Sequence, residues 1–76
     1  MDIYSHVESM TYEDKVYIDA WKSEDAEREA VAYVEVPTKE IHWLEESAKE
    51  DSLVKLEINL VMKDIDAGDF FFVKQH

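Results

Sequence analysis

The segment at residues 52–62 most constrains how this chain can fold, because apolar and polar side chains alternate along it. Lys55, Glu57 and Asn59 occupy every second position, and apolar residues stand between them. Successive side chains of a β-strand point to opposite faces of the sheet, so the alternation predicts a strand at 53–62. Its apolar face would consist of Val54, Leu56, Ile58, Leu60 and Met62. We expect the remainder of the chain to cover that face.

The length of the chain, 76 residues, predicts a single domain at 1–76 with a modest core. Hydrophobic residues make up 46% of it, which is too many for a disordered tail. Because the chain has no Cys, we expect no disulfide and no thiolate metal site, and a cytoplasmic location fits. The acidic N-terminus does not resemble a signal peptide, and no apolar run approaches the length of a membrane span.

The charge of the chain is strongly negative. Nineteen acidic and eight basic residues give a net charge of −11. This charge disfavours direct binding to nucleic acid or to an anionic membrane, and it favours a cationic partner. The acidic residues are spread along the whole chain, so we expect them to belong to the folded surface. The alternative is that they serve solubility alone.

Two strands are predicted in the first half of the chain, at 15–22 and 29–36, joined by an acidic loop at 23–28. Both segments alternate, and both are rich in β-branched or aromatic residues. In the first strand one face would carry Val16, Ile18 and Ala20, and the other Tyr17, Asp19 and Trp21. The two strands would form a hairpin.

Two alternatives remain open in this half of the chain. A helix at 24–33 competes with the hairpin, because Ser23 can cap it and acidic residues fill its first turn. Residues 1–14 fit either a short helix or a strand by their apolar spacing. We favour the hairpin, preceded by a strand or an ordered arm.

A helix is predicted at about 38–50. Thr38 can cap its N-terminus, and an acidic residue lies in its first turn. Trp43 would then lie on the polar face of this helix, close to Glu46 and Glu50. An aromatic residue among acids on a helix surface is unusual and marks this face as a candidate contact surface.

The predicted fold is therefore α+β. It is a small, mostly antiparallel β-sheet in β-β-α-β-β order, with an extra N-terminal element and one covering helix at about 38–50. An acidic turn separates the strand at 53–62 from a last strand at 70–74. Because the last strand is about half as long, residues 53–57 would need another partner strand or would present a free edge.

The last predicted strand contains three consecutive phenylalanines. Phe70 and Phe72 would point to one face of the sheet, and Phe71 and Val73 to the other. A sheet covered by one helix buries only one of these faces. Phe71 and Val73 are therefore a candidate homodimer interface, and coverage by the N-terminal arm is the alternative.

We predict no catalytic residue, no metal site and no cofactor. Residues 64–69 lack the ligand spacing of an EF-hand, so we expect an ordinary turn in which Gly68 adopts a positive φ. His42 is expected to be a solvated helix residue. The histidines do not have the spacing of a metal site; they are His6, His42 and His76.

Acidic residues crowd the predicted hairpin loop, the predicted helix and the second turn. Combined with an aromatic residue, such arrays are typical of protein interfaces, although solvated loops are the alternative. The candidate partner contacts are Glu24, Asp25, Glu27, Glu29, Trp43, Glu46 and Glu50.

In being short, very acidic, free of Cys and α+β, the chain resembles DNA-mimicking inhibitors encoded by phages and other mobile elements. Such inhibitors occupy the basic nucleic-acid groove of restriction, CRISPR, repair or nucleoid proteins. The resemblance implies a non-enzymatic inhibitor of a basic nucleic-acid-binding protein in the host cytoplasm. One alternative is a homodimeric interaction module or small accessory subunit, and another is a metal-binding protein that uses the turn at 64–69.

Overall fold

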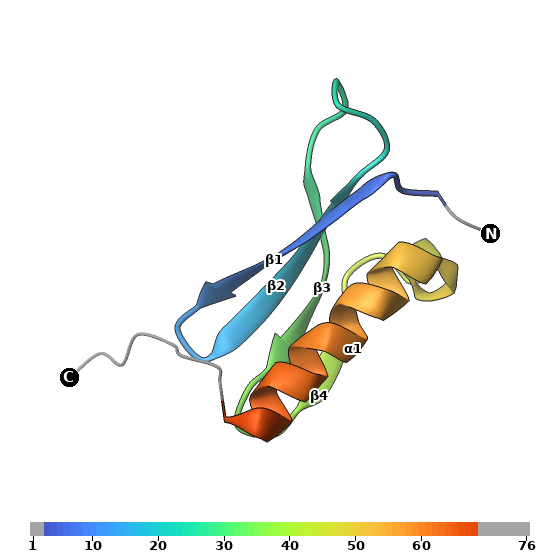
Figure 1. Cartoon of the computed structure of the whole chain (residues 1–76). Helices are drawn as coiled ribbons and strands as arrows, with labels where there is room; N and C mark the ends of the chain where they lie inside the picture. The colour runs from blue at the N-terminus through green and yellow to red at the C-terminus, as the bar shows by residue number, and fades with distance from the viewer. Residues whose placement is uncertain (1–2, 69–76) are drawn as a thin grey trace.

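The computed structural model describes residues 3–68, which form an antiparallel sheet with one helix packed across it (Figure 1). The four strands of this part of the chain lie in the order β1-β2-β3-β4, so each strand pairs with its neighbour in sequence. The elements are β1 (His6–Tyr12), β2 (Lys15–Trp21), β3 (Glu29–Glu35), β4 (Glu40–Trp43), the 3₁₀ helix η1 (Glu46–Glu50) and α1 (Ser52–Ala67). The α+β class predicted from the sequence, an antiparallel sheet covered by one helix, is confirmed.

The element order differs from the predicted one, because the helix lies at Ser52–Ala67 and residues 53–62 are not a strand. Val54, Ile58 and Val61 are buried at helical spacing against the sheet. Leu60, which the strand pattern assigned to the apolar face, is 47% exposed. Apolar residues in this segment recur both at every second position, as in a strand, and at every third or fourth position, as in a helix. The residues at helical spacing are the ones that pack on the core.

Both ends of α1 carry helix-terminating residues. The Asp51 side chain accepts hydrogen bonds from the backbone N–H groups of Leu53 and Val54, as an N-cap does. Gly68 ends the helix with φ 74°, so the predicted positive φ at Gly68 is confirmed. No helix within residues 3–68 has the length and apolar character needed to cross a membrane.

The helix predicted at 38–50 is also wrong. Glu40–Trp43 forms β4, which pairs with β3, and the chain then makes the short helix η1. The Thr38 hydroxyl accepts a hydrogen bond from the Glu40 backbone N–H within the turn, so it does not cap a helix. Lys39 completes the turn with φ 63°. Pairing with β4 provides hydrogen-bond partners for the backbone N–H and C=O groups on one side of β3. These hydrogen bonds outweigh the weak helix propensity of residues 38–50.

The hairpin of the first half is confirmed, with strands β2 and β3 and the loop at 22–28 between them. The alternative helix at 24–33 is absent from the described structure, and the favoured N-terminal strand is present as β1. The β2–β3 register shifts between Ile18 and Asp19. This irregularity lets Val31 and Ala32 be buried in succession on β3.

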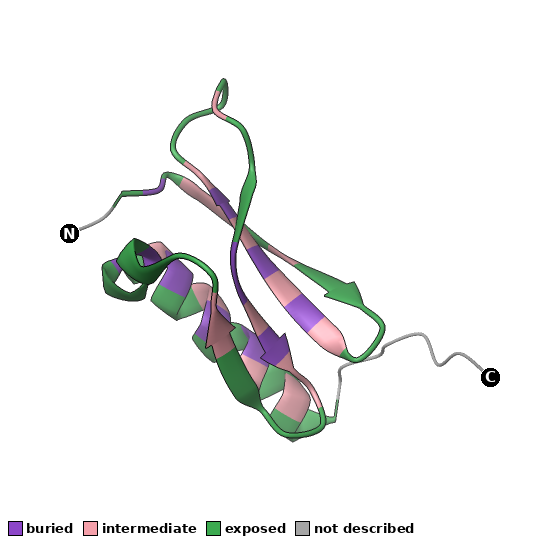
Figure 2. Ribbon diagram, turned by 180° about the vertical axis from the view of Figure 1, so that it is seen from behind, coloured by how far each residue is buried: buried purple, intermediate pink, exposed green. Residues whose placement is uncertain are grey.

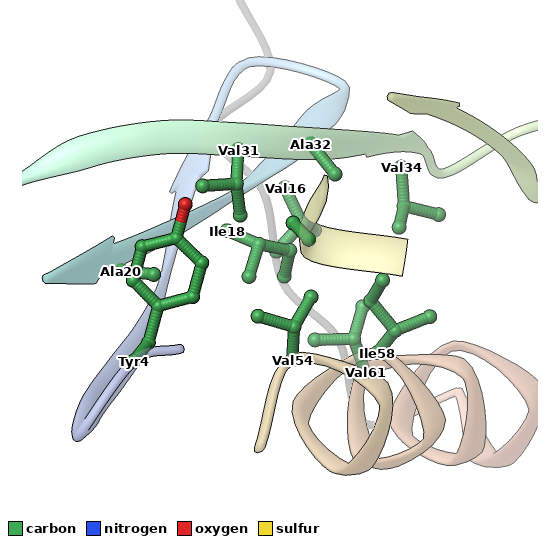
Figure 3. Packing of buried hydrophobic residues seen from close by; sticks show 11 residues of the cluster. Tyr4, Val16, Ile18, Ala20, Val31, Ala32, Val34, Val54, Ile58 and Val61 are labelled. Atoms are coloured by element: carbon green, nitrogen blue, oxygen red, sulfur yellow. The ribbon is translucent and has the colours of Figure 1, made fainter. Parts of the chain in front are cut away.

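The core lies between the sheet and α1. Val16, Ile18 and Ala20 of β2 are fully buried, and the side chains of the sheet point toward those of the helix (Figure 3). Tyr4, which precedes β1, belongs to the same cluster of buried residues (Figure 3). Most residues of the β2–β3 loop and of the outer side of α1 are exposed (Figure 2).

The strand predicted at 70–74, with the interface residues Phe71 and Val73, lies outside the described residues. The free strand edge inferred for residues 53–57 does not exist, because these residues are helical.

Candidate functional site

The sheet has two faces, and α1 covers one of them (Figure 1). Side chains alternate along each strand, so the residues between the buried ones point to the other face. We call this surface the open face. It carries His6, Glu8, Met10, Tyr12, Lys15, Tyr17, Asp19, Trp21, Ala30, Tyr33, Glu35, Glu40 and His42.

A row of rings crosses the open face from β2 to β4. Tyr17, Tyr33 and His42 are direct partners in the strand register. The ring centroids of Tyr17 and Tyr33 are 5.4 Å apart, and those of Tyr33 and His42 are 4.6 Å apart in a stacked arrangement. Met10 of β1 continues the row opposite Tyr17 and is 49% exposed. Cross-strand packing of this kind restricts the motion of the rings.

A second aromatic group lies near the β2–β3 loop. The rings of His6 and Trp21 stack with centroids 5.2 Å apart. The Arg28 guanidinium lies 4.4 Å from the centre of the Trp21 ring and 3.6 Å from a carboxylate oxygen of Glu8. Arg28 therefore ties the end of the acidic loop to the open face through a cation–π contact and an ion pair.

Carboxylates stand opposite each other on the open face. The register pairs Glu8 with Asp19 across β1 and β2, and Glu35 with Glu40 across β3 and β4. Like charges directly opposite in a sheet repel and destabilise it. A cationic surface brought against this face would relieve that repulsion.

Three of the predicted contact residues lie together in the β2–β3 loop. Glu24, Asp25 and Glu27 are exposed, and the loop projects beyond the sheet (Figure 1). Within residues 3–68, none of the three forms an ion pair. Their charge is therefore not compensated locally.

The other predicted acids lie away from the open face. Glu29, the first residue of β3, lies near Tyr4: burial raises the pKa of Tyr4, and the carboxylates of Glu29 and of Glu45, which is not one of the predicted contacts, raise it further. Glu46 is paired with Lys49 at 3.1 Å on η1, and the exposed Glu50 ends the same helix. The structure thus divides the predicted set between the β2–β3 loop and the region around η1.

Trp43 does not lie on a polar helix face, as the sequence predicted. It belongs to β4, pairs with Ala32 in the register, and packs half-buried against the core. Its side chain therefore lies on the helix side of the sheet and not on the open face. His42, expected to be a solvated helix residue, is instead part of the aromatic row.

Oxygen and nitrogen ligands for a metal come together once in the described part of the chain, at Glu35, Glu40 and His42. The turn that the sequence offered for calcium does not form a loop, because residues 64–67 belong to α1. Its last acid, Asp69, lies outside the described residues.

Tyr17, Tyr33 and Trp21 belong to the open face, and the sequence prediction did not include them among the candidate contacts. The alternation in the sequence already placed Tyr17 and Trp21 on the face of the strand opposite Val16 and Ile18.

Comparisons with protein-family models, with curated proteins and with solved structures found no match for this chain. Its function is therefore inferred from the geometry of the open face and the acidic loop.

Proposed function

We propose that this chain is a non-catalytic acidic protein that binds a basic, nucleic-acid-handling protein and blocks its nucleic-acid-binding surface. The observation that carries the proposal is the open face, where fixed aromatic rings lie between opposed pairs of carboxylates. Aromatic anchors surrounded by charge are typical of protein interfaces. The resemblance to phage-encoded inhibitors supports a target in the cytoplasm of a host cell.

A protein partner fits this face better than nucleic acid does. Lys15 and Arg28 are the basic residues at the open face within the described part of the chain, and each is paired with an acid, Asp14 or Glu8. Contacts to phosphate need unpaired basic groups, and the net charge of −11 repels a polyanion. Stacking of bases on the tyrosines would therefore be opposed by charge.

The acidic loop and the open face would act at different stages of binding. Glu24, Asp25 and Glu27 project into solvent, so their field would speed the approach of a cationic partner. The half-buried rings of Tyr17 and Tyr33 would lose their remaining contact with water in the complex and supply affinity.

The second candidate is a homodimeric interaction module, and the free edge of β1 favours it. β1 pairs with β2 alone among the described strands, so one side of its backbone has no strand partner. Met10 and Tyr12 are 49% and 63% exposed on this strand. Such an edge can pair with another copy of itself. The interface proposed at Phe71 and Val73 would serve the same function.

Affinity capture at two salt concentrations tests the first proposal. The tagged chain is incubated with host-cell lysate freed of nucleic acid by nuclease, and bound proteins are identified by mass spectrometry. We expect nucleic-acid-binding proteins at low salt and their loss at high salt, because the encounter is electrostatic. A bound set that is unchanged by salt, or that contains no basic protein, would contradict the proposal.

Light scattering of the purified chain separates the two candidates. A monomer at micromolar concentration favours the inhibitor. A stable dimer that a charged substitution on β1, Met10→Glu, converts to a monomer favours the homodimeric module.

A further inference from the structure

We infer that Glu35, Glu40 and His42 form a binding site for a zinc-like divalent cation on the open face. One carboxylate or imidazole ligand atom from each residue lies within 4.8 Å of the ligand atoms of the other two. The three residues lie on the open face, as the proposed interface does, but the inference does not depend on the proposed function, because zinc binding is measured on the chain alone.

The strand register brings the three residues together. Glu35 and Glu40 are the directly opposed pair that closes the β3–β4 ladder. His42 lies two residues beyond Glu40 on β4, so its side chain points to the same face. A tight hairpin therefore fixes all three backbone positions, and the turn that joins the strands is closed by a hydrogen bond from the Lys39 N–H to the Glu35 carbonyl of 2.7 Å.

The imidazole of His42 is oriented toward the carboxylates. Stacking on Tyr33, with the two ring planes only 14° apart, restricts its rotation. Its Nε2 atom is buried and lies 3.2 Å from the Glu35 Oε1 atom, yet it makes no hydrogen bond there. The contact has the distance of an ion pair without the alignment of a hydrogen bond. The His42 side chain as a whole is 39% exposed, and a neutral imidazole nitrogen beside carboxylates can coordinate a metal ion.

The nearby lysines do not neutralise the pair of glutamates fully. Lys39, in the turn between the two strands, forms its ion pair with Asp66 of α1. Lys15 stands opposite Glu35 in the register, but its ammonium group is 3.3 Å from Asp14. The repulsion between the opposed carboxylates thus remains, and a divalent cation between them would remove it.

The ligand set favours zinc over magnesium or calcium. Zinc accepts imidazole nitrogen together with carboxylate oxygen, whereas magnesium and calcium prefer oxygen alone. Three protein ligands would leave a fourth position for water. Ligand atoms about 2.1 Å from one tetrahedral zinc ion lie about 3.4 Å apart, so small side-chain rotations would close the site.

Calorimetric titration of the metal-free chain with zinc chloride tests the site. We expect one zinc ion per chain, and at least tenfold weaker binding for His42→Gln, Glu40→Gln and Glu35→Gln. Substitutions at the other histidines, His6→Gln and His76→Gln, and at an acid of α1, Glu57→Gln, are matched controls that should retain the wild-type affinity. A tenfold excess of magnesium should not displace the zinc.

Nuclear magnetic resonance of the wild-type chain keeps the test independent of how the variants fold. Zinc should shift the imidazole nitrogen signals of His42 more than those of His6 or His76. Absence of zinc binding, equal binding by wild type and His42→Gln, or loss of binding on substitution of His6 or His76 would overturn the inference.

Discussion

The Asp51 carboxylate fixes Tyr4 to the start of α1, because its Oδ2 atom accepts a hydrogen bond of 2.9 Å from the Tyr4 backbone N–H. The same oxygen accepts a bond of 2.6 Å from Ile3, and Oδ1 accepts one of 2.9 Å from Leu53. Asp51 is the one charged residue that is fully buried within residues 3–68. A single side chain therefore caps the helix and holds the arm that closes the core.

Asp51→Asn should destabilise the domain by about 2 kcal/mol, because an amide NH₂ cannot accept hydrogen bonds from buried N–H groups. Its neighbour Glu50 is exposed on η1, so Glu50→Gln is a matched control and should change stability by less than about 0.5 kcal/mol. Urea unfolding followed by circular dichroism measures both variants. Equal stabilities of the two variants would show that the Asp51 hydrogen bonds contribute little.

The stability difference between wild type and Asp51→Asn should depend on pH. Burial alone would raise the pKa of Asp51, but hydrogen bonds from the backbone of Tyr4, Ile3, Val54 and Leu53 bring it below its usual value of 3.8. The contribution of the carboxylate is therefore complete above about pH 3.8 and is lost as the pH falls through the lower folded value. Unfolding free energies measured from pH 7 to pH 2 test this. A difference that stays constant over that range would contradict it.

Ile58→Ala and Leu60→Ala should have very different effects, although the strand prediction placed both residues on one buried face. Ile58 packs in the core and Leu60 is 47% exposed on α1. We expect a loss of about 3 kcal/mol for Ile58→Ala and of less than about 1 kcal/mol for Leu60→Ala. Urea unfolding measures both, and similar large losses would support the strand over the helix.

The sequence predicted the class of the fold but not the position of its helix. The apolar residues of β2 fit the two-residue spacing of a strand and no other, since Val16, Ile18 and Ala20 are separated by polar or aromatic residues. The segment of α1 fits both a strand spacing and a helix spacing. Leu56 and Leu60 complete the strand-like alternation, although both are exposed on the helix. Only the packing of Val54, Ile58 and Val61 on the sheet selects the helical period.

The candidate site was predictable in part. The exposed acids of the β2–β3 loop follow from composition and the hairpin pattern, and the structure places Glu24, Asp25 and Glu27 there. The aromatic row depends on register, which brings Tyr17 beside Tyr33 and cannot be read from either strand alone. The position of Trp43 was misassigned because it depended on the helix at 38–50.

Charge reversal in the loop, with Glu24→Lys, Asp25→Lys and Glu27→Lys combined, should slow association with the captured partner at least tenfold at low salt. In the proposal the loop residues steer the encounter, and because all three side chains are exposed, the free energy of unfolding should change by about 1 kcal/mol or less. Stopped-flow measurements at two ionic strengths test this, and the rates should converge at high salt. An unchanged low-salt rate would exclude a steering role for the loop.

Tyr33→Ala should weaken binding of the partner at least tenfold, because Tyr33 is the centre of the aromatic row. The substitution also removes cross-strand packing worth about 1 kcal/mol, so its folding is checked by circular dichroism. Leu56→Ala, on the outer side of α1, is the control and should bind as the wild type does. Equal affinities of the two variants would place the interface away from the open face.

Competition with duplex DNA tests the central proposal most directly. The purified partner is bound to labelled DNA and titrated with this chain, and complexes are followed by fluorescence anisotropy and size-exclusion chromatography. If the chain occupies the nucleic-acid-binding surface, it should release the DNA completely, and excess DNA should displace the chain in return. A stable ternary complex of partner, DNA and chain would contradict the account.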